Sequence, residues 1–306
     1  LMELKKEIAN YLENCRYMKG LSEKTIKAYS IDLKQYEGFT KEKESWCIKS
    51  VIEDYIKHAY INFKPRSARR KISSLKAFFH YLELEDILEI NPFHKIMLKH
   101  KEPLVLPKTI PMNIFRNILC CAYENTTKED YTDLQRKNAI RDIAVIELLF
   151  ASGIRINELC NLKIQDVDLK NKIIKVNGKG SKERYIYITN QNVMLALKSY
   201  YKTFAEDIER TEHFFINNRG NKLSEQSARF MIKKYEKKTN SKIHITPHMF
   251  RHTVATLLLE EDVDIRYIQE LLGHSSITTT QIYTHISMRA QKKILSKKHP
   301  RNKIYI

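Results

Sequence analysis

The stretch KIIKVNGKGSKERYIYIT, residues 172–189, holds the clearest strand pattern in a chain whose other patterns are helical. It joins an apolar, β-branched run at 173–176 to a turn pair at 177–178 and then to alternating tyrosines and isoleucines at 185–188. Only seven glycines, with many Lys, Ile and Leu residues, favour helix elsewhere. We therefore predict a mainly α fold with one small antiparallel β-sheet, and Lys179 at or beside a hairpin tip.

Composition narrows the class of protein. A length of 306 residues is enough for two domains, each with its own core. Lys and Arg number 54 against 36 Asp and Glu, and the formal net charge of +18 suits a polyanion such as nucleic acid or an anionic membrane surface. There is no apolar run of bilayer length and no signal-peptide pattern, so we expect a soluble intracellular protein without a membrane partner.

The five cysteines argue against a disulfide framework or a zinc site. Their number is odd and no pair has the C-x-x-C spacing. We interpret them as reduced thiols that lie mostly in the core, and we expect no metal ion.

The chain divides near residue 100. In SARRKISSLKAFFHYL, residues 67–82, apolar positions recur every four or three residues, which predicts one buried helix face with Ser67 as the N-cap. Helix-blocking prolines follow at positions 92, 103, 107 and 111. We expect an N-terminal helical domain at 1–99, a linker at 100–110 and a second domain at 111–306.

A helix break in the second domain places two charged residues together. In RDIAVIELLFASGIRINELCNL, residues 141–162, an apolar-periodic helix runs to Ser152 and Gly153 is a typical C-terminal stop. Arg155 follows the break, and Glu158 lies three residues later on the same helix face. The alternative interpretation is an ordinary surface ion pair.

A second helix start collects basic side chains. Thr246 followed by Pro247 predicts a cap and a first-turn proline, so His248 and Arg251 leave the first turn in the same direction. A helix N-terminus attracts anions, and cations placed there favour an arriving anion. His252 lies off this face, and we interpret it as structural.

A third segment, YIQELLGHSSITTTQIYTHIS at 267–287, contains another glycine stop. Gly273 is predicted to end a helix, and His274 lies in the break, either as a C-cap or as a functional group. Tyr283 follows nine residues later. With 17 tyrosines in the chain, a core aromatic is the alternative to a reactive hydroxyl.

The segments ASGIRINEL (151–159), GKGSKER (178–184), TPHMFRHTVAT (246–256) and LLGHSSITTTQIYTH (271–285) resemble the tyrosine recombinase family, most of all its Xer-type bacterial members. More weakly, residues 19–36 and 66–82 are similar to that family's N-terminal core-binding, SAM-like domain. The resemblance implies the active-site set Arg155, Lys179, His248, Arg251, His274 and Tyr283, with Glu158 as an accessory acid. The polar stretch 125–138, which we expect to be a loop or helix extension, departs from chromosomal Xer proteins.

The chemistry of a phosphodiester makes this set intelligible. The two arginines can bind the non-bridging oxygens, where negative charge develops, and His274 can donate to one of them. Tyr283 is the expected nucleophile and His248 its base, while Lys179 protonates the departing 5′-oxygen. The product is a 3′-phosphotyrosyl enzyme with a free 5′-hydroxyl, so neither a cofactor nor ATP is expected.

The resemblance also implies partners. The family forms a two-domain, C-shaped clamp around double-stranded DNA with inverted-repeat sites, acts as a synaptic homotetramer and is expected to be a monomer in solution. Its C-terminal tail, here 289–306, docks on a neighbouring protomer. The expected location is the bacterial cytoplasm, with the nucleoid when bound to DNA. Candidate DNA contacts, with a merely solvated helix face as the alternative, are Arg66, Arg69, Arg70 and Lys76.

Two other functions remain open on the sequence alone. A type IB topoisomerase-like enzyme shares the tyrosine chemistry but relaxes supercoils, and a non-catalytic helical regulator would share the charge and the helices. Integration, excision, inversion and chromosome-dimer resolution all use the recombinase chemistry.

Overall fold

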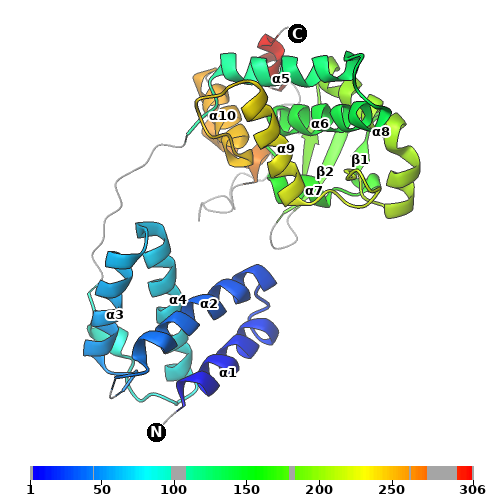
Figure 1. The fold of residues 1–306 in the computed structure, drawn as a ribbon. Coiled ribbons are helices and arrows are strands. Elements are labelled where there is room, and N and C mark those ends of the chain that lie inside the picture. Colours follow the sequence, from blue (N-terminus) through cyan, green and yellow to red (C-terminus); the bar gives the residue numbers. More distant parts are fainter. Residues whose placement is uncertain are drawn as a thin grey trace. The chain divides into compact units, whose positions relative to one another are not determined.

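The computed structural model describes residues 3–43, 45–97, 108–178, 183–261, 263–273 and 295–304. The chain forms two compact units, Leu1–Leu104 and Val105–Ile306, called unit 1 and unit 2 below (Figure 1). Both are mainly helical, as the sequence predicted, and the described part of unit 2 contains a small antiparallel sheet. Within the described ranges, no helix is long and apolar enough to cross a membrane.

Unit 1 encloses a core rich in aromatic rings. Tyr36 packs edge-on against Tyr55 and Phe79, with ring centroids 4.9 and 6.2 Å apart. All three rings are buried, so these tyrosines serve packing. The described elements of unit 1 are α1 (Leu4–Tyr17), α2 (Glu23–Thr40), α3 (Lys49–Asn62), α4 (Pro65–Leu84) and the 3₁₀ helix η1 (Pro92–Lys95).

Helix α4 confirms the predicted apolar face but begins earlier than expected. Its predicted core positions are all buried: Ala68, Ile72, Leu75, Phe79 and Leu82. The N-cap position is Lys64, not Ser67, and Pro65 is the first helical residue. A proline fits this position because its fixed φ is helical and its missing N–H would have no intrahelical partner.

Unit 2 places most of its helices around one central helix, α6. Its described elements are α5 (Met112–Thr127), α6 (Asp133–Ser152), α7 (Ile156–Asn161), η2 (Ile164–Asp166), β1 (Val167–Asp168), β2 (Ile173–Asn177), β3 (Glu183–Tyr187), α8 (Gln191–Thr211), α9 (Glu225–Lys238), α10 (Pro247–Glu260), α11 (Ile265–Leu272) and η4 (Pro300–Lys303). The polar segment 125–138 contains the end of α5, a short connection and the start of α6. There Thr132 and Gln135 form a reciprocal capping box.

The sheet has the strand order β1-β2-β3, and both pairings are antiparallel. The predicted hairpin is confirmed as β2 and β3, but Asn177 still pairs with Glu183. The connection therefore spans 178–182 and is longer than a two-residue turn at Asn177 and Gly178. Lys179 falls in this connection, outside the described residues. Strand β1, two residues long, was too short to leave a pattern in the sequence.

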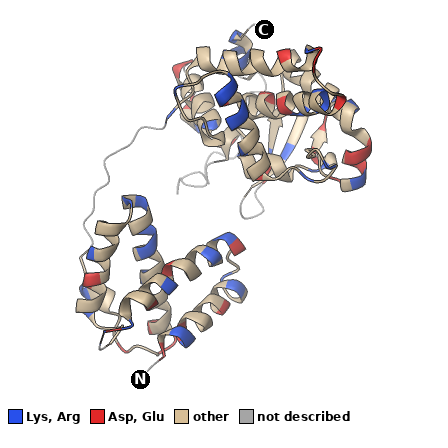
Figure 2. Ribbon diagram, in the orientation of Figure 1, with Lys and Arg blue, Asp and Glu red and all other residues tan. Residues whose placement is uncertain are grey.

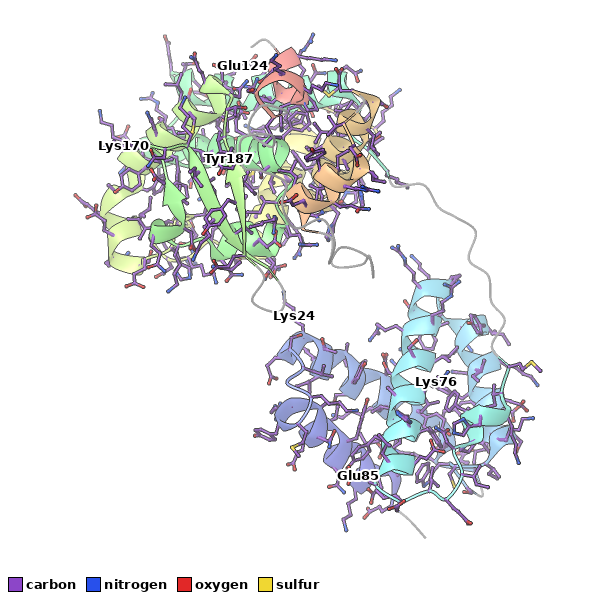
Figure 3. The ribbon with its side chains drawn as sticks, turned by 180° about the vertical axis from the view of Figure 1, so that it is seen from behind. Lys24, Lys76, Glu85, Glu124, Lys170 and Tyr187 are labelled. Atoms are coloured by element: carbon purple, nitrogen blue, oxygen red, sulfur yellow. The ribbon has the colours of Figure 1, made fainter. Side chains whose placement is uncertain are left out.

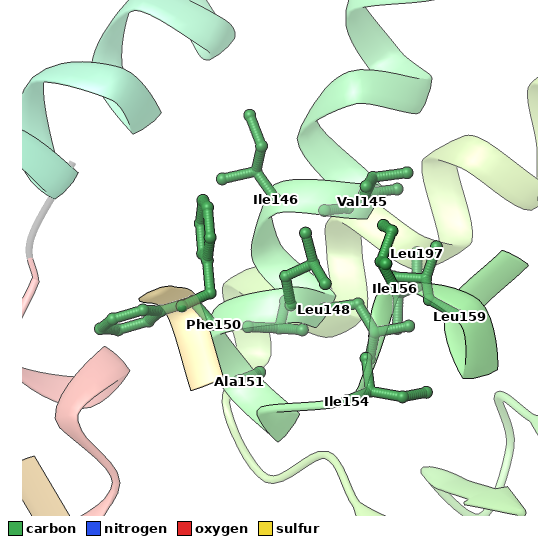
Figure 4. Packing of buried hydrophobic residues seen from close by; sticks show 14 of the residues in the cluster. Val145, Ile146, Leu148, Phe150, Ala151, Ile154, Ile156, Leu159 and Leu197 are labelled. Atoms are coloured by element: carbon green, nitrogen blue, oxygen red, sulfur yellow. The ribbon is translucent and has the colours of Figure 1, made fainter. Parts of the chain in front are cut away.

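Helix α6 is buried on every side from Asp142 to Ser152. It contacts α5, α8, α9 and α10, and Figure 4 shows its apolar side chains Val145, Ile146, Leu148 and Phe150 at close range. A helix enclosed in this way needs no polar face, which explains why apolar residues fill positions all around it. Its rigid end supports the segment that follows.

The boundary of unit 2 begins earlier than the sequence indicated. Ile110, assigned to the linker 100–110, is buried in the core of unit 2. Its backbone N–H donates to Thr253 Oγ1 on α10 at 2.7 Å. Ile110 therefore belongs to unit 2 rather than to a solvated linker.

Residues 295–304 of the tail pack on their own unit, against α6 and α10. Docking of the tail on a neighbouring protomer stays a prediction. Arg301 is fully buried and its Nε and Nη2 donate to the two oxygens of Glu147 on α6, at 2.6 and 2.5 Å. His299 lies beside it, and burial lowers its pKa to about 4. The tail thus contributes Arg301 to a buried ion pair in which the charge of Glu147 is neutralised.

The five cysteines are free thiols. Cys15 and Cys160 are buried in the two cores, and the half-buried Cys47 and Cys121 pack against them, so most of the cysteines lie in or against a core, as expected; Cys120 is half-buried. In the part of the chain that the structure describes, no group of three or more His, Cys, Asp or Glu side chains could hold a metal ion.

Helix α6 ends at Gly153, as the sequence predicted. This residue has φ 59° and ψ 21°, a left-handed conformation, and its N–H donates to the carbonyl of Leu149 at 3.0 Å. A Cβ atom at this position would collide with Cδ2 of Leu272, which is buried at the end of α11. The turn therefore requires glycine both for its backbone and for its space.

We expect Gly153→Ala to destabilise unit 2 by about 1–3 kcal/mol, because a left-handed backbone and an overpacked contact add together. Urea unfolding followed by circular dichroism measures this change. The control is Gly38→Ala in α2, where a Cβ meets nothing within 4 Å and no positive φ is present. That variant should gain about 0.5–1 kcal/mol of helix stability. An unchanged unfolding midpoint for Gly153→Ala would contradict the account.

Candidate active site

The site begins at the break between α6 and α7. After Gly153 turns the chain, Arg155 takes the N-cap position of α7 and Glu158 the third helical position. The Glu158 carboxylate accepts from the backbone N–H of Arg155 at 3.0 Å and from its Nη1 at 2.7 Å. The predicted proximity of the two residues is confirmed, but this is no surface ion pair, since only 6% of the Glu158 side chain is exposed.

Glu158 has a second arginine partner, Arg184 on β3. The Nη1 and Nη2 atoms of Arg184 donate to the two carboxylate oxygens at 3.1 and 2.7 Å. Burial alone would raise the pKa of Glu158, but the hydrogen bonds and charges of Arg184 and Arg155 outweigh it and hold the pKa below its usual range. Glu158 is therefore a permanent anion at neutral pH.

Arg251 is the second arginine of the predicted set and lies almost wholly inside unit 2. It is 4% exposed, and its Nη1 donates to the carbonyl of Gly153 at 3.0 Å. Its Nη2 is buried without a hydrogen-bond partner among the described residues. Burial, followed by the nearby charge of Arg155, lowers the pKa of Arg251 to about 10, so the guanidinium remains charged at neutral pH. Leaving a buried cationic donor without a partner costs stability.

The start of α10 positions Arg251 and His248. Pro247 is the first helical residue, as predicted, but the side chain of Thr246 makes no capping hydrogen bond. His248 is exposed one turn before the buried Arg251. His252 is half-buried, and its pKa is lowered by burial and then by His248 and Arg251. The first turn thus carries the exposed imidazole of His248 and the buried guanidinium of Arg251.

The end of α11 contacts Arg155 and Arg184. Gly273 is left-handed, with φ 65° and ψ 53°, and ends the helix as predicted. Its carbonyl accepts from Arg155 Nη2 at 2.7 Å, and the carbonyl of Leu271 accepts from Arg184 Nε at 3.1 Å. His274 follows directly in the sequence. His274, Tyr283 and Lys179 all lie outside the described residues.

Sequence reasoning missed Arg184. The signal was present, because Arg184 alternates in phase with Ile186 and Ile188, both of which are buried. An arginine at an inward position of a strand needs an internal anion. From the GKGSKER segment, the sequence predicted only Lys179 as a site residue.

Seven tyrosines among the described residues have a shifted pKa. Within the described ranges, burial is the main cause in each case and raises the pKa, for example to about 12 in Tyr55. A phenol of this kind stays protonated at neutral pH and serves packing or structural hydrogen bonding.

The candidate DNA contacts on α4 are basic but not equivalent (Figure 2). Arg66, Arg70 and Lys76 are exposed, whereas Arg69 is half-buried; Figure 3 labels Lys76. Arg70 Nη1 donates to the buried carboxylate of Asp32 on α2 at 2.7 Å. Arg70 therefore has a structural task in joining α2 to α4, which sequence reasoning did not separate from a binding task.

Comparison with known proteins places this site in a family. Residues 124–290 match the profile of the phage integrase family, and residues 8–86 match the N-terminal SAM-like domain of phage integrases. The chain is 52% identical to a tyrosine recombinase of Agathobacter rectalis over 299 residues, 97% of each chain. It is 33% identical to the tyrosine recombinase XerC of Bacillus subtilis over 301 residues, 95% of each chain.

Solved structures support the fold. Lambda integrase (residues 75–356) bound to DNA is similar with a TM-score of 0.67 and 18% identity, covering 100% of both chains. The XerH site-specific recombinase bound to difH has a TM-score of 0.66 and 22% identity, covering 90% of this chain and 82% of its own. The chain belongs to the phage integrase family and is a tyrosine recombinase.

Proposed function

We propose that Arg155 and Arg251 hold the scissile phosphodiester of a recombination site in double-stranded DNA while Tyr283 attacks it. The observation that carries the proposal is the Nη2 of Arg251, which is buried, charged and without a partner among the described residues. Leaving a buried cationic donor unsatisfied costs stability, and an incoming anion removes that cost. A phosphate oxygen is the anion that the chemistry of this family supplies.

The charge of the cluster fits this substrate. Arg155 is half-buried, and its charge lies close enough to Arg251 to help lower the pKa of Arg251. A phosphodiester carries one negative charge and gains a second as phosphorus becomes five-coordinate. Two guanidinium groups that converge on one side of the site therefore bind the transition state more tightly than the substrate.

The remaining roles are assigned to four side chains. The hydroxyl oxygen of Tyr283 forms a bond to phosphorus as the bond to the 5′-oxygen breaks, and the phenolic proton passes to His248. Lys179 gives a proton to the departing 5′-oxygen, and His274 donates a hydrogen bond to a non-bridging oxygen. The exposure of His248 one turn before Arg251 supports its part, because an accessible imidazole can come within hydrogen-bond reach of an incoming hydroxyl. Attack by a 5′-hydroxyl of the partner strand reverses the step.

The proposed partners are a duplex with inverted-repeat sites and three further copies of the chain. Lambda integrase is known as a dimer bound to a core site and as a tetramer bound to a Holliday junction. By this likeness we infer a synaptic homotetramer on DNA and a monomer in solution. Residues 1–99 and 111–306 would both contact the duplex, and the net charge of +18 favours such contact. The proposed location is the cytoplasm of a bacterium.

Tyr283→Phe should bind site-bearing DNA with unchanged affinity, because it removes a single hydroxyl, and should form no covalent complex. A nicked suicide substrate traps the phosphotyrosyl product, which denaturing electrophoresis then detects. Supercoiled plasmid without a site is the companion substrate, since efficient relaxation would indicate a topoisomerase. Persistent adduct in Tyr283→Phe would assign the nucleophile to another residue.

Lys179→Ala should cleave about 10²- to 10⁴-fold more slowly, the usual loss for one proton donor, with DNA binding little changed. Substituting sulfur for the bridging 5′-oxygen makes protonation unnecessary, because a thiolate leaves readily. Cleavage of that substrate by Lys179→Ala should approach the rate of the unmutated enzyme, whereas Arg155→Ala should stay slow. Equal rescue of both variants, or of neither, would move the acid role to another group such as Lys182.

Binding should weaken steeply with salt, with a log-log slope of about 0.9 per neutralised phosphate. Arg66→Ala and Lys76→Ala should each flatten the slope by about one unit if each contacts one phosphate. Lys57→Ala, which removes an exposed charge from α3, is the matched control and should leave the slope unchanged. Arg70→Ala should mainly destabilise unit 1, because Asp32 stays buried. Slopes that do not change would assign this face of α4 to the solvent.

A further inference from the structure

Arg184 connects three segments of unit 2 that are far apart in the sequence. Its Nη1 and Nη2 donate to Glu158 at the start of α7, and its Nε donates to the carbonyl of Leu271 at the end of α11. Only 11% of its side chain is exposed, so water screens these charged hydrogen bonds little. The guanidinium therefore acts as a rigid link between β3, α7 and α11.

Arg184 reaches Arg155 through Glu158. The Oε1 atom of Glu158 accepts from Nη1 of both arginines, and Oε2 accepts from Nη2 of Arg184 and the backbone N–H of Arg155. A carboxylate held by the planar fork of one guanidinium has a fixed orientation. Arg184 thus decides the geometry with which Glu158 meets Arg155.

The two arginines also share the end of α11. Arg155 Nη2 donates to the carbonyl of Gly273, and a Cβ at Gly273 would lie only 3.1–3.3 Å from atoms of the Arg184 side chain. Cationic donors at the C-terminus of a helix satisfy its last carbonyls. The residue that follows this end is His274.

Arg184 on β3 pairs with Val176 on β2, and the next pair along the two strands is Asn177 with Glu183. The connection 178–182, which includes Lys179, starts and ends at that last pair. A displacement of Arg184 would therefore displace the base of the connection, because the sheet register transmits it.

We propose that Arg184 is a positioning residue for strand cleavage, one that aligns Arg155, the base of the connection carrying Lys179 and the helix end preceding His274, without contacting DNA. This inference rests on the proposed function of those three residues. Arg184 acts through hydrogen bonds that are complete before DNA arrives. Arg251 differs in this, because its Nη2 has no partner in the part of the chain that the structure describes.

Arg184 also balances the charge of the site. Arg155, Arg184 and Arg251 surround a single carboxylate, Glu158, so the cluster carries two net positive charges. A five-coordinate phosphorus with two anionic oxygens carries two negative charges. Without Arg184, Glu158 would cancel half of the charge available to the transition state.

The test compares Arg184→Gln with Lys175→Gln, which removes an exposed ion pair to Glu183 on the same two strands. Covalent-complex formation on the nicked suicide substrate should slow about 100-fold in Arg184→Gln, the scale of a small misplacement of reacting groups. Its DNA affinity should stay within about threefold of the unmutated value, because no phosphate contact is lost. Lys175→Gln should match the unmutated protein in both measurements.

A double-mutant cycle with Glu158→Gln separates positioning from direct contact. If Arg184 acts through Glu158, the double variant should be no slower than the slower single variant, since both remove the same link. The inference would be overturned if the rate losses of the two single variants multiply in the double variant and Arg184→Gln also binds DNA more weakly. That result would show that Arg184 touches DNA.

Arg184→Lys serves if Arg184→Gln loses its cooperative thermal unfolding. It keeps a charge beside Glu158, but one ammonium cannot serve both Glu158 oxygens and Leu271, so cleavage should still slow about tenfold or more. A folded Arg184→Lys with the unmutated cleavage rate would overturn the proposal. Absence of covalent complex in the unmutated protein would instead refute the proposed function, so the two failures are distinguishable.

Discussion

A buried carboxylate destabilises a protein unless cationic or hydrogen-bond-donating groups surround it. In unit 2 this constraint applies to Glu158. Its two oxygens collect hydrogen bonds from the α6–α7 break and from β3, and the same arginines continue to the end of α11. The buried charge therefore joins three segments that lie far apart in the sequence.

The fold could be predicted wherever a local rule decides. Gly153 and Gly273 end helices because their left-handed conformations suit glycine, and Pro247 starts one because its φ is fixed. The pairing of Arg155 with Glu158 followed from their spacing. What could not be predicted depends on distant partners: the burial of Glu158 and the role of Arg184 exist only after a strand and a helix meet. The same holds for the packing of Ile110 and Arg301, whose neighbours lie far along the chain.

Buried arginines in unit 2 fall into two kinds. Arg301 donates to both oxygens of Glu147 and to the carbonyl of Ile304, so its charge is neutralised and its geometry complete. Arg251 has one carbonyl partner and an Nη2 without a partner among the described residues, although burial disfavours its charge. The first kind holds the fold together. The second is the kind that the proposed function assigns to binding a phosphate.

Because the Nη2 of Arg251 has no partner among the described residues, we expect the free energy of unfolding to depend on the anions in the solution. Any oxyanion that ligates this nitrogen in the native state, and finds no such receptor in the unfolded chain, raises the free energy of unfolding by mass action. Phosphate or sulfate in a buffer would thus act as a thermodynamic surrogate for the DNA backbone.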